Sequence, residues 1–407
     1  MRAAARAAVE PRPILEDLDG DHPERSGMRR AVRRPRRLGR YLVSEPIAHG
    51  GMASVHLAVV DEDPGRVYAL KRIHPHLAND EYFTHMLLDE NAIGAAIQHP
   101  NVIATYGGEH CDGELLLVME YVAGASLAEL GRACNGPMPP RYAAAIVAGA
   151  LRGLHAAHEA LDSRGHSLGI VHRDVSPQNV MVGIDGVPRI FDFGIATATR
   201  RLQSTRAGTL KGKLAYMAPE QVLQTSCDRR VDVYAAGVVL WEALTGQDLF
   251  QERNDAATLA RLLESDIVRP SLVHEEIPRA IDAIVMRALA RDPDRRYGTA
   301  LEMAEALERV LCRQPVSAME LGGWVSQLAE LQLARQEQIR HTLQAPPSPP
   351  SPPRSHVALA TLAPPRFRVE NEPAAPGSFI DVALVLALVL SSGLAGALAM
   401  QLLHHRL

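Results

Sequence analysis

HRDVSPQN, at residues 172–179, is the stretch that decides the fold. Four other short strings accompany it in a fixed order: IAHGGMASV at 47–55, YALK ending at Lys71, FDFG at 191–194 and YMAPE at 216–220. Each string alone occurs by chance in unrelated proteins, whereas the ordered set on predicted strands and helices does not. A glycine-rich turn lets backbone N–H groups approach phosphates, and a buried lysine paired to a carboxylate can hold them. The set therefore indicates a nucleotide-phosphate site.

Two of these features have ordinary structural explanations. A β-hairpin would also use Gly50 and Gly51 in its turn, and a lysine at a strand edge can be a solvated surface residue. Lysine usage argues against the second explanation, because Lys71, Lys211 and Lys213 are the only lysines among 43 basic residues. Where arginine replaces nearly every exchangeable cation, a surviving lysine marks a place that needs a compact ammonium group, with chance survival as the alternative.

Length and composition indicate a folded chain with no general attraction for nucleic acid. The 407 residues are 47% apolar, which is enough to bury a sizeable core. The 43 basic and 47 acidic side chains give a net charge of −4, so the chain has no field that would attract a polyanion. Four widely spaced cysteines fit neither a zinc site nor a disulfide scaffold, and they predict reduced thiols in a cytosolic domain.

The pattern along the chain predicts two lobes of different type. From Tyr41 short apolar runs alternate with turn residues, which indicates strands joined by hairpins, with one helix from about Asp80. After Gly124 the periodicity becomes mostly helical, so the predicted fold class is α+β, with a small mainly β lobe before a larger mainly α lobe. The predicted segments are a disordered basic arm at 1–40, a globular domain at 41–314, a helical extension at 315–344 and a Pro-rich linker at 345–377. The arm either stays solvated or touches acidic lipid headgroups or an acidic partner. The extension either packs on the second lobe or forms a stalk.

The stretch 382–403 contains no charged residue. As a helix it would be about 33 Å long, enough to cross a bilayer core of about 30 Å. A buried soluble helix is the alternative, although such helices seldom run this long without a polar face. The sequence thus predicts a single-pass, tail-anchored protein of the cell membrane with its large domain in the cytoplasm. Small residues four apart in the span, such as Gly393 and Ala397, would also allow a homodimer to form.

Residues 41–312 resemble the protein-kinase domain, most closely the eukaryotic-like (Hanks-type) serine/threonine kinases of bacteria. The resemblance rests on the strings quoted above and on VDVYAAG, which begins at Val231. It implies the two-lobed kinase fold, ATP with Mg²⁺ (or alternatively Mn²⁺) as cofactors, and protein substrates. The implied reaction moves the γ-phosphate of ATP to serine or threonine hydroxyls, including those of the activation segment, in a membrane-tethered signalling pathway.

Residue by residue, the resemblance implies a catalytic aspartate at Asp174 and magnesium ligands at Asn179 and Asp192, whose hard oxygen atoms suit Mg²⁺. For ATP it implies a lysine, Lys71, with its helix glutamate, Glu90; a gatekeeper, Met119, followed by the hinge residues Glu120 and Val122; and two further contacts, Ala69 and Met181. It also implies a phosphate loop made of Ile47, Ala48, His49, Gly50, Gly51, Met52, Ala53, Ser54 and Val55. The implied structural and regulatory residues are His172, Arg173, Phe193, Gly194, Asp232 as the brace of the catalytic loop, Glu220 paired with Arg296, and two phosphorylation sites, Thr205 and Thr209. A phosphate at either site would pair with Arg173 and order the segment.

Two departures from the family pattern leave the activity open. Ala48 and Ala53 replace glycines of the phosphate loop, which stiffens the loop but still lets the backbone approach phosphates. Ser176 stands where the family carries a lysine that contacts the γ-phosphate and the catalytic aspartate, and Lys213 stands where the family carries a threonine. We expect Lys213 to supply the missing charge and Ser176 the missing hydroxyl; the alternative is a solvated Lys213 and a slow or inactive enzyme.

Three hypotheses follow for the function. The leading one is a membrane-tethered serine/threonine kinase. The second is a pseudokinase that acts as a membrane-anchored scaffold, which Ser176 favours and the retained Lys71 and Asp174 oppose. The third is a kinase of small molecules, which YMAPE and VDVYAAG oppose because they build a platform for protein substrates in the family. Pro177 resembles the serine/threonine branch, whereas the absence of a threonine at 213 leaves tyrosine as an acceptor open.

Overall fold

The computed structural model describes residues 34–345 of the 407, apart from 79, 81–83, 85–86, 89–90, 92–93 and 194–212. Glu90, Gly194, Thr205 and Thr209 therefore lie outside the described residues, as do the predicted span 382–403 and all but the first residue of the Pro-rich linker. No helix in the described part of the chain is long and apolar enough to cross a bilayer.

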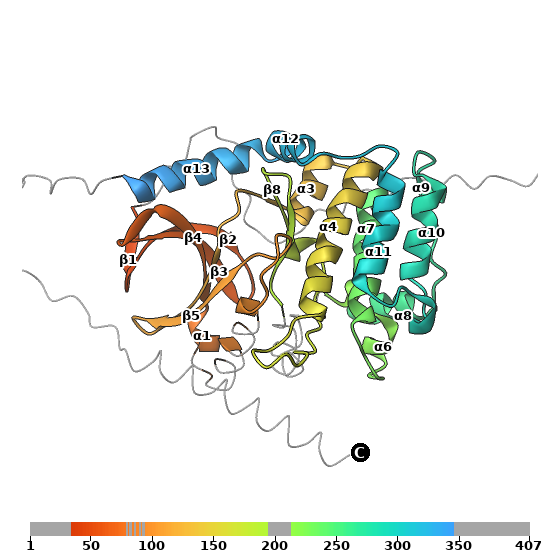
Figure 1. Cartoon of the computed structure of the whole chain (residues 1–407), viewed down its shortest axis with the longest axis horizontal. Helices are drawn as coiled ribbons and strands as arrows, with labels where there is room; N and C mark the ends of the chain where they lie inside the picture. The colour runs from red at the N-terminus through yellow and green to blue at the C-terminus, as the bar shows by residue number, and fades with distance from the viewer. Residues whose placement is uncertain are drawn as a thin grey trace, which may run out of the picture. The chain divides into compact units, whose positions relative to one another are not determined.

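The first lobe is an antiparallel sheet with the strand order β1-β2-β3-β4-β6-β5 (Figure 1). Its middle strands are buried on successive residues rather than on every second one: seven of the eight residues of Ala53–Val60 are buried, as are the four residues 115–118. Leu57 and Leu70, for example, are fully buried on neighbouring strands. The strands are β1 (Arg36–Leu38), β2 (Tyr41–His49), β3 (Ala53–Val60), β4 (Asp63–Ile73), β5 (Thr105–Cys111) and β6 (Glu114–Glu120), with the short helix α1 (Pro75–Ala78) after β4.

The end of the predicted basic arm is part of this sheet. Arg36–Leu38 pairs with β2, and Leu38 is only 3% exposed. The expectation of a disordered arm reaching residue 40 is therefore wrong at its last residues. Leu38 follows a run of arginines, which is typical of a solvated tail, but its apolar side chain is buried in the core.

The second lobe packs helices around α7 (Arg230–Thr245), which is apolar on nearly all sides and almost wholly buried. The helix begins with the VDVYAAG string and ends at Gly246, whose φ of +66° suits a residue without Cβ. The other helices are α3 (Leu127–Cys134), α4 (Pro140–His158), α6 (Pro219–Val222), α8 (Asp255–Glu264), α9 (Pro270–Val273), α10 (Arg279–Ala288) and α11 (Ala300–Leu311), with short 3₁₀ turns η2 (Leu214–Tyr216) and η3 (Pro293–Arg295).

A small sheet lies where the two lobes meet, in the order β7-β8-β9. It consists of β7 (Gly124–Ser126), β8 (Val180–Gly183) and β9 (Pro188–Ile190), and the 3₁₀ turn η1 (Pro177–Asn179) leads into β8. Because HRDVSPQN precedes β8 and FDFG follows β9, this sheet places both strings at one edge of the second lobe. The predicted layout of a mainly β lobe before a mainly α lobe is confirmed.

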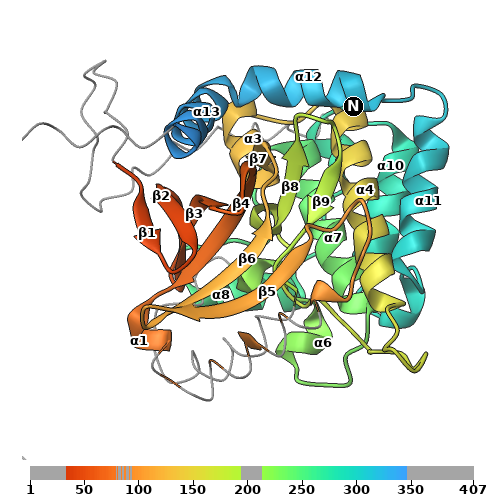
Figure 2. The same ribbon diagram turned by 60° about the vertical axis from the view of Figure 1, so that its left-hand side comes forward.

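The helical extension packs on the second lobe, as one of the two alternatives from the sequence has it, and it also contacts the first lobe, which neither alternative included. Its first helix, α12 (Ala318–Leu328), packs against α3, β7 and β8, and its second, α13 (Glu330–Gln344), crosses β2, β3 and β4 (Figure 2). Ser317 caps α12 by accepting a hydrogen bond from Glu320 N at 3.1 Å, whereas α13 follows the buried Ala329 without a side-chain cap.

Candidate active site

Asp232 of α7 accepts hydrogen bonds from the backbone of the HRDVSPQN loop. Its carboxylate is fully buried and accepts hydrogen bonds from His172 N at 2.8 Å, Arg173 N at 2.7 Å and His158 Nε2 at 2.8 Å. Arg173 has a φ of +62°, a left-handed conformation that costs energy for a residue with Cβ. The buried carboxylate stabilises this conformation, because it is the acceptor that both backbone N–H groups share.

His172 connects the strings HRDVSPQN and FDFG. Its Nε2 donates to the Phe191 carbonyl oxygen at 3.0 Å, so its Nδ1 is the nitrogen that accepts from Asp174 N at 3.2 Å. The His172 and Phe193 rings also pack with their centroids 4.7 Å apart. These contacts place Asp174 beside the residues that follow β9.

Asp174 is the point where three predicted site residues meet. Asn179 Nδ2 donates to the Asp174 carbonyl oxygen at 2.8 Å and to Asp174 Oδ2 at 3.2 Å. Lys213 Nζ lies 2.7 Å from the same Oδ2, and its side chain is 38% exposed against 14% for Asp174. Lys213 is held there because the next two residues, Leu214 and Ala215, are buried against the second lobe. The carboxylate therefore has a cation beside it without any lysine at position 176.

Ser176 is 7% exposed, in extended backbone just before η1. Its carbonyl oxygen accepts a hydrogen bond from Asn179 N at 3.0 Å, which closes the turn. Within the described residues the contacts of Ser176 are thus structural ones of the loop, and the contact to Asp174 is made by Lys213.

Lys71 lies on the first lobe and reaches the second lobe through its side chain. It stands on β4 opposite Val55 of β3 and Leu117 of β6, and its Nζ is 2.6 Å from Asp192 Oδ2. The two side chains are 11% and 19% exposed, so the ion pair is largely shielded from water. The predicted partner Glu90 is not among the described residues.

The glycine-rich stretch is a tight hairpin. Strand β2 continues to His49 and β3 begins at Ala53, so only residues 50–52 form the turn, closed by Gly50 N donating to Ala53 O at 2.8 Å. His74 N donates to Met52 O at 2.9 Å, which fixes the turn to the end of β4. The sequence placed residues 47–55 between two strands, whereas the strands run into both ends of it.

The remaining ATP-site residues of the prediction lie around the junction of the lobes. Met119 on β6 faces Ala69 on β4 in register, and Glu120, the last residue of β6, donates from its N to Ala104 O at 2.8 Å. Behind Met119 a small enclosed cavity reaches Asp192 and Phe193. Met181 lies on β8 in the other lobe.

The residues present fit Mg²⁺ by their chemistry. Asn179 uses its amide nitrogen toward Asp174, which leaves its Oδ1 as an acceptor, and Asp192 supplies a second hard oxygen ligand. Among the described residues no group of three or more His, Cys, Asp or Glu side chains is arranged so that it could hold a metal ion by itself. One or two protein oxygens completed by phosphates and water are what Mg²⁺ uses at nucleotide sites.

Glu220 and Arg296 form a buried ion pair beneath the site. Arg296 donates from both terminal nitrogens to the two carboxylate oxygens of Glu220, at 2.6 and 2.8 Å, and its guanidinium lies over the Tyr234 ring at 4.7 Å. The Arg296 side chain is 0% exposed and that of Glu220 is 8% exposed. The pair joins YMAPE to the turn before α11.

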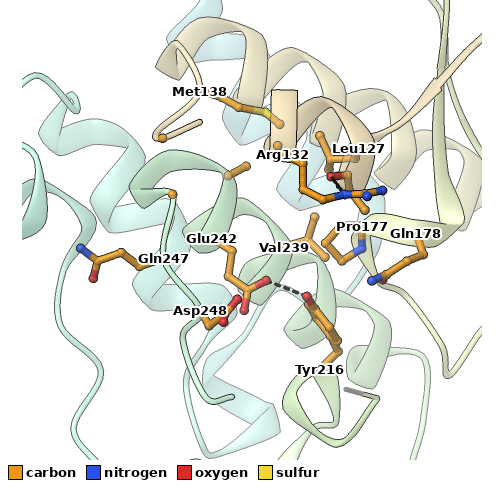
Figure 3. A pocket seen from close by; sticks show the side chains of 15 residues that line it. Leu127, Arg132, Met138, Pro177, Gln178, Tyr216, Val239, Glu242, Gln247 and Asp248 are labelled. Carbon is orange, nitrogen blue, oxygen red and sulfur yellow. Dashed lines mark hydrogen bonds between the residues drawn. The ribbon is translucent and has the colours of Figure 1, made fainter. Parts of the chain in front are cut away.

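A cavity that the sequence did not predict opens beside the catalytic loop (Figure 3). Pro177 and Gln178 line one side of it, and Tyr216 donates to Glu242 Oε2 at 2.7 Å on the other. Burial raises the pKa of Glu242 to about 7, with the nearby Asp248 adding to the effect, and burial next to Glu242 raises the pKa of Tyr216. Tyr216 lies within the quoted YMAPE string, but no local signal marked Glu242, 26 residues later in α7.

Two lobes that are joined by a lysine–aspartate ion pair, with the aspartate next to an aspartate–asparagine loop of the second lobe, define the two-lobed kinases as a class. The family model described as the protein kinase domain matches residues 41–310, and the chain belongs to this family. Residues matched over 294 positions are 37% identical to a protein named tyrosine-protein kinase MasK of Myxococcus xanthus, covering 70% of this chain and 46% of that protein. Over 284 residues the chain is 38% identical to serine/threonine-protein kinase PknB of Mycobacterium leprae, covering 69% of this chain and 44% of that protein.

Solved structures agree with the fold. The crystal structure of the Mycobacterium tuberculosis PknI kinase domain matches 69% of this chain and 99% of its own length, with a TM-score of 0.52 and 25% identity. The chain spans less than half the length of the two relatives above, so what they share with it is the kinase domain.

Proposed function

We propose that this chain is an ATP-dependent protein kinase that transfers the γ-phosphate of ATP to serine and threonine hydroxyls of proteins. The observation that carries the proposal is the contact of 2.7 Å between Lys213 Nζ and Asp174 Oδ2. It supports activity because it places an ammonium group beside the catalytic aspartate, where Ser176 has left the family's lysine position without a charge.

The roles of the other residues follow from their positions. The 50–52 turn and Lys71 would hold the phosphates of ATP, and Asn179 with Asp192 would hold Mg²⁺, which when bound neutralises charge on the transferring phosphoryl group. Asp174 accepts the proton of the substrate hydroxyl. The hydroxyl oxygen forms a bond to the γ-phosphorus as the bond to the β–γ bridging oxygen breaks, and ADP leaves.

Lys213 acts on charge that develops in this reaction. Its ammonium can turn from Asp174 toward the γ-phosphoryl oxygens, since its side chain is partly exposed and has four rotatable bonds. A cation removed from such a place typically costs about 100-fold to 1,000-fold in kcat.

The test is phosphate transfer from labelled ATP by the full-length chain, with Asp192→Ala as the blank. We expect Lys213→Ala to lower kcat by about 100-fold while nucleotide affinity changes little, since Lys213 contacts Asp174 and not the residues around the 50–52 turn. Arg229→Ala is the matched control, because it removes a cation from an exposed pair with Glu159 and should leave transfer unchanged.

A scaffold that binds ATP without transferring phosphate is the second candidate, and Ser176 is the observation that favours it. Wild-type transfer equal to that of the Asp192→Ala blank, with Mg²⁺ or Mn²⁺ and a generic protein substrate, would establish the scaffold. Equal transfer by wild type and Lys213→Ala would instead retain the kinase and remove the role of Lys213.

The acceptor residue needs its own measurement. One relative is named a tyrosine-protein kinase and another a serine/threonine-protein kinase, at similar identity. Peptide libraries that differ only in the acceptor, Ser, Thr or Tyr, would separate them. We expect Ser and Thr peptides to be labelled, and labelling of the Tyr library alone would overturn the choice.

The signalling context is proposed from the sequence. We place the kinase domain in the cytoplasm, tethered by the span 382–403, in which Gly393 and Ala397 would support a homodimer, with Thr205 and Thr209 as phosphorylation sites that pair with Arg173. Membrane fractionation of full-length and 1–377 chains tests the tether. Mass spectrometry of active protein tests the two threonines.

A further inference from the structure

The helices α12 and α13, residues 318–344, lie outside the residues 41–310 matched by the kinase family and carry none of the proposed chemistry. We call them the strap. In Figures 1 and 2 the strap runs along one side of both lobes, with its corner near the junction between them. The corner is Ala329, which ends α12 and precedes α13.

The first helix of the strap is fixed to the second lobe. Leu321 and Val325 are 3% and 0% exposed, and the Trp324 ring packs on Tyr142 of α4 with centroids 5.0 Å apart. Gly322 touches the β8–β9 turn so closely that a Cβ there would lie 2.1 Å from the Ile184 carbonyl oxygen. Such contacts leave α12 no freedom to move separately from this lobe.

The second helix of the strap is fixed to the first lobe. Ile339 and Leu343, four residues apart on one face of α13, are 1% and 3% exposed and form a cluster with Leu57 and Val59 of β3. Ile47, near the end of β2, packs on the same cluster. Motion of α13 is therefore transmitted to the strands that carry the 50–52 turn.

The strap also contacts the hinge directly. Tyr121, between the predicted hinge residues Glu120 and Val122, donates from its hydroxyl to Gln336 Oε1 at 3.0 Å. Gln336 is only 8% exposed, so this bond satisfies a buried amide. A further bond runs from Arg335 to Glu45 of β2 at 3.1 Å. One helix thus holds the hinge and the phosphate-binding strand β2 together.

We propose that the strap sets the separation of the two lobes and positions the hinge and the 50–52 turn for ATP, with Gln336, Ile339 and Leu343 as positioning residues. The lobes cannot rotate apart while α12 stays on one and α13 on the other, unless the corner at Ala329 bends. This inference rests on the proposed nucleotide site but not on phosphate transfer.

Releasing α13 should act on ATP binding more than on chemistry. The apparent dissociation constant equals the intrinsic one divided by the fraction of molecules with correctly placed lobes, so reducing that fraction to about 0.1 weakens binding about tenfold. Lys213, Asp174 and Asn179 lie in the other lobe and keep their geometry, so kcat at saturating ATP should change much less.

The experiment compares Leu343→Asp with Leu331→Asp in the full-length chain. Both replace a leucine of α13 by aspartate, but Leu343 is 3% exposed in the cluster and Leu331 is 89% exposed. The affinity of a fluorescent ATP analogue, the KM for ATP, kcat and the hydrogen exchange of residues 41–60, 114–124 and 330–344 are measured. We expect Leu343→Asp to raise the dissociation constant and KM about tenfold, with faster exchange in all three segments, and Leu331→Asp to match wild type.

Gln336→Ala is the milder variant, which removes the hinge bond and keeps the apolar cluster; it remains informative if Leu343→Asp does not fold. Faster exchange in 330–344 with unchanged nucleotide affinity would overturn the proposal, because α13 would then be released without effect on the cleft. An equal loss of affinity in Leu331→Asp would overturn it as well. If wild type binds the analogue but transfers no phosphate, the kinase function fails while the binding comparison still decides the role of the strap.

Discussion

Lys213 Nζ and Asp174 Oδ2 lie 2.7 Å apart, and these two residues are separated by 39 positions in the sequence. Ser176, two residues after Asp174, is buried at the position where the family carries its lysine. The ammonium group beside the Asp174 carboxylate therefore belongs to Lys213 of the activation segment and not to residue 176.

The exchange of the two residue types can be tested by reversing it. Lys213→Thr should lower kcat about 100-fold, and adding Ser176→Lys should recover most of that loss, because the charge returns to Asp174 from the family position. Ser176→Lys alone should give no gain, since it places a second ammonium beside one carboxylate. Failure of the double variant to exceed Lys213→Thr, with both folded by circular dichroism, would refute the exchange.

The Glu220–Arg296 pair should be essential for stability. Arg296→Ala leaves the Glu220 carboxylate buried without its partner, so we expect a loss of about 3–5 kcal/mol in the free energy of unfolding. Arg309→Ala is the control, because Arg309 lies 3.9 Å from Glu305 in an exposed pair and should cost less than about 1 kcal/mol. Urea unfolding of both variants measures the difference, and equal losses would contradict this account.

The pH dependence of stability should contain a contribution from Glu242. Since burial raises its pKa from 4.5 to about 7, the folded state binds this proton more tightly than the unfolded state does. The contribution is therefore full below pH 4.5 and is lost as pH rises to about 7, with a total on the order of 3 kcal/mol. No further loss from this group is expected above about pH 8.

Urea unfolding at pH 5, 6, 7 and 8 tests this by comparing wild type with Glu242→Gln. The free energy of unfolding of wild type minus that of the variant should fall from pH 5 to pH 8. The effect of the substitution on the hydrogen bonds from Tyr216 and Leu249 is the same at each pH and does not change this trend. Glu305→Gln, at an exposed site, should show no such trend. A pH-independent difference for Glu242→Gln would mean that this carboxylate titrates normally.

Sequence strings predicted the residue types of the site but not every partner. The structure brings Asp174, Asn179 and Asp192 of HRDVSPQN and FDFG to adjoining elements, because the short β8–β9 hairpin connects the two strings. The contact between Lys71 and Asp192 spans 121 positions, which no local spacing encodes. The position of Lys213 was predicted from a family pattern, and its distance to Asp174 required the folded chain.

The helices of the strap were predicted from the sequence, but the contact of α13 with the first lobe was not, for a different reason. Helical spacing puts Gln336, Ile339 and Leu343 on one face of α13, but a glutamine on that face breaks the apolar stripe that would predict burial. The glutamine is explained only by the hydroxyl of Tyr121, a hinge residue 215 positions earlier. A polar residue with a distant partner is therefore read from sequence as solvent-exposed.

Adjacent glycines in α12 give a last, matched test of how tightly the strap meets the second lobe. Gly323→Ala should stabilise the protein by about 0.5–1 kcal/mol, because nothing lies within 4 Å of its added Cβ and alanine favours a helix interior. Gly322→Ala should destabilise it, since its Cβ would lie 2.1 Å from the Ile184 carbonyl oxygen and would push α12 away from the β8–β9 turn. Thermal unfolding compares the two, and hydrogen exchange should rise in 318–344 for Gly322→Ala alone. Equal stabilisation by both substitutions would show that α12 is not packed against the turn.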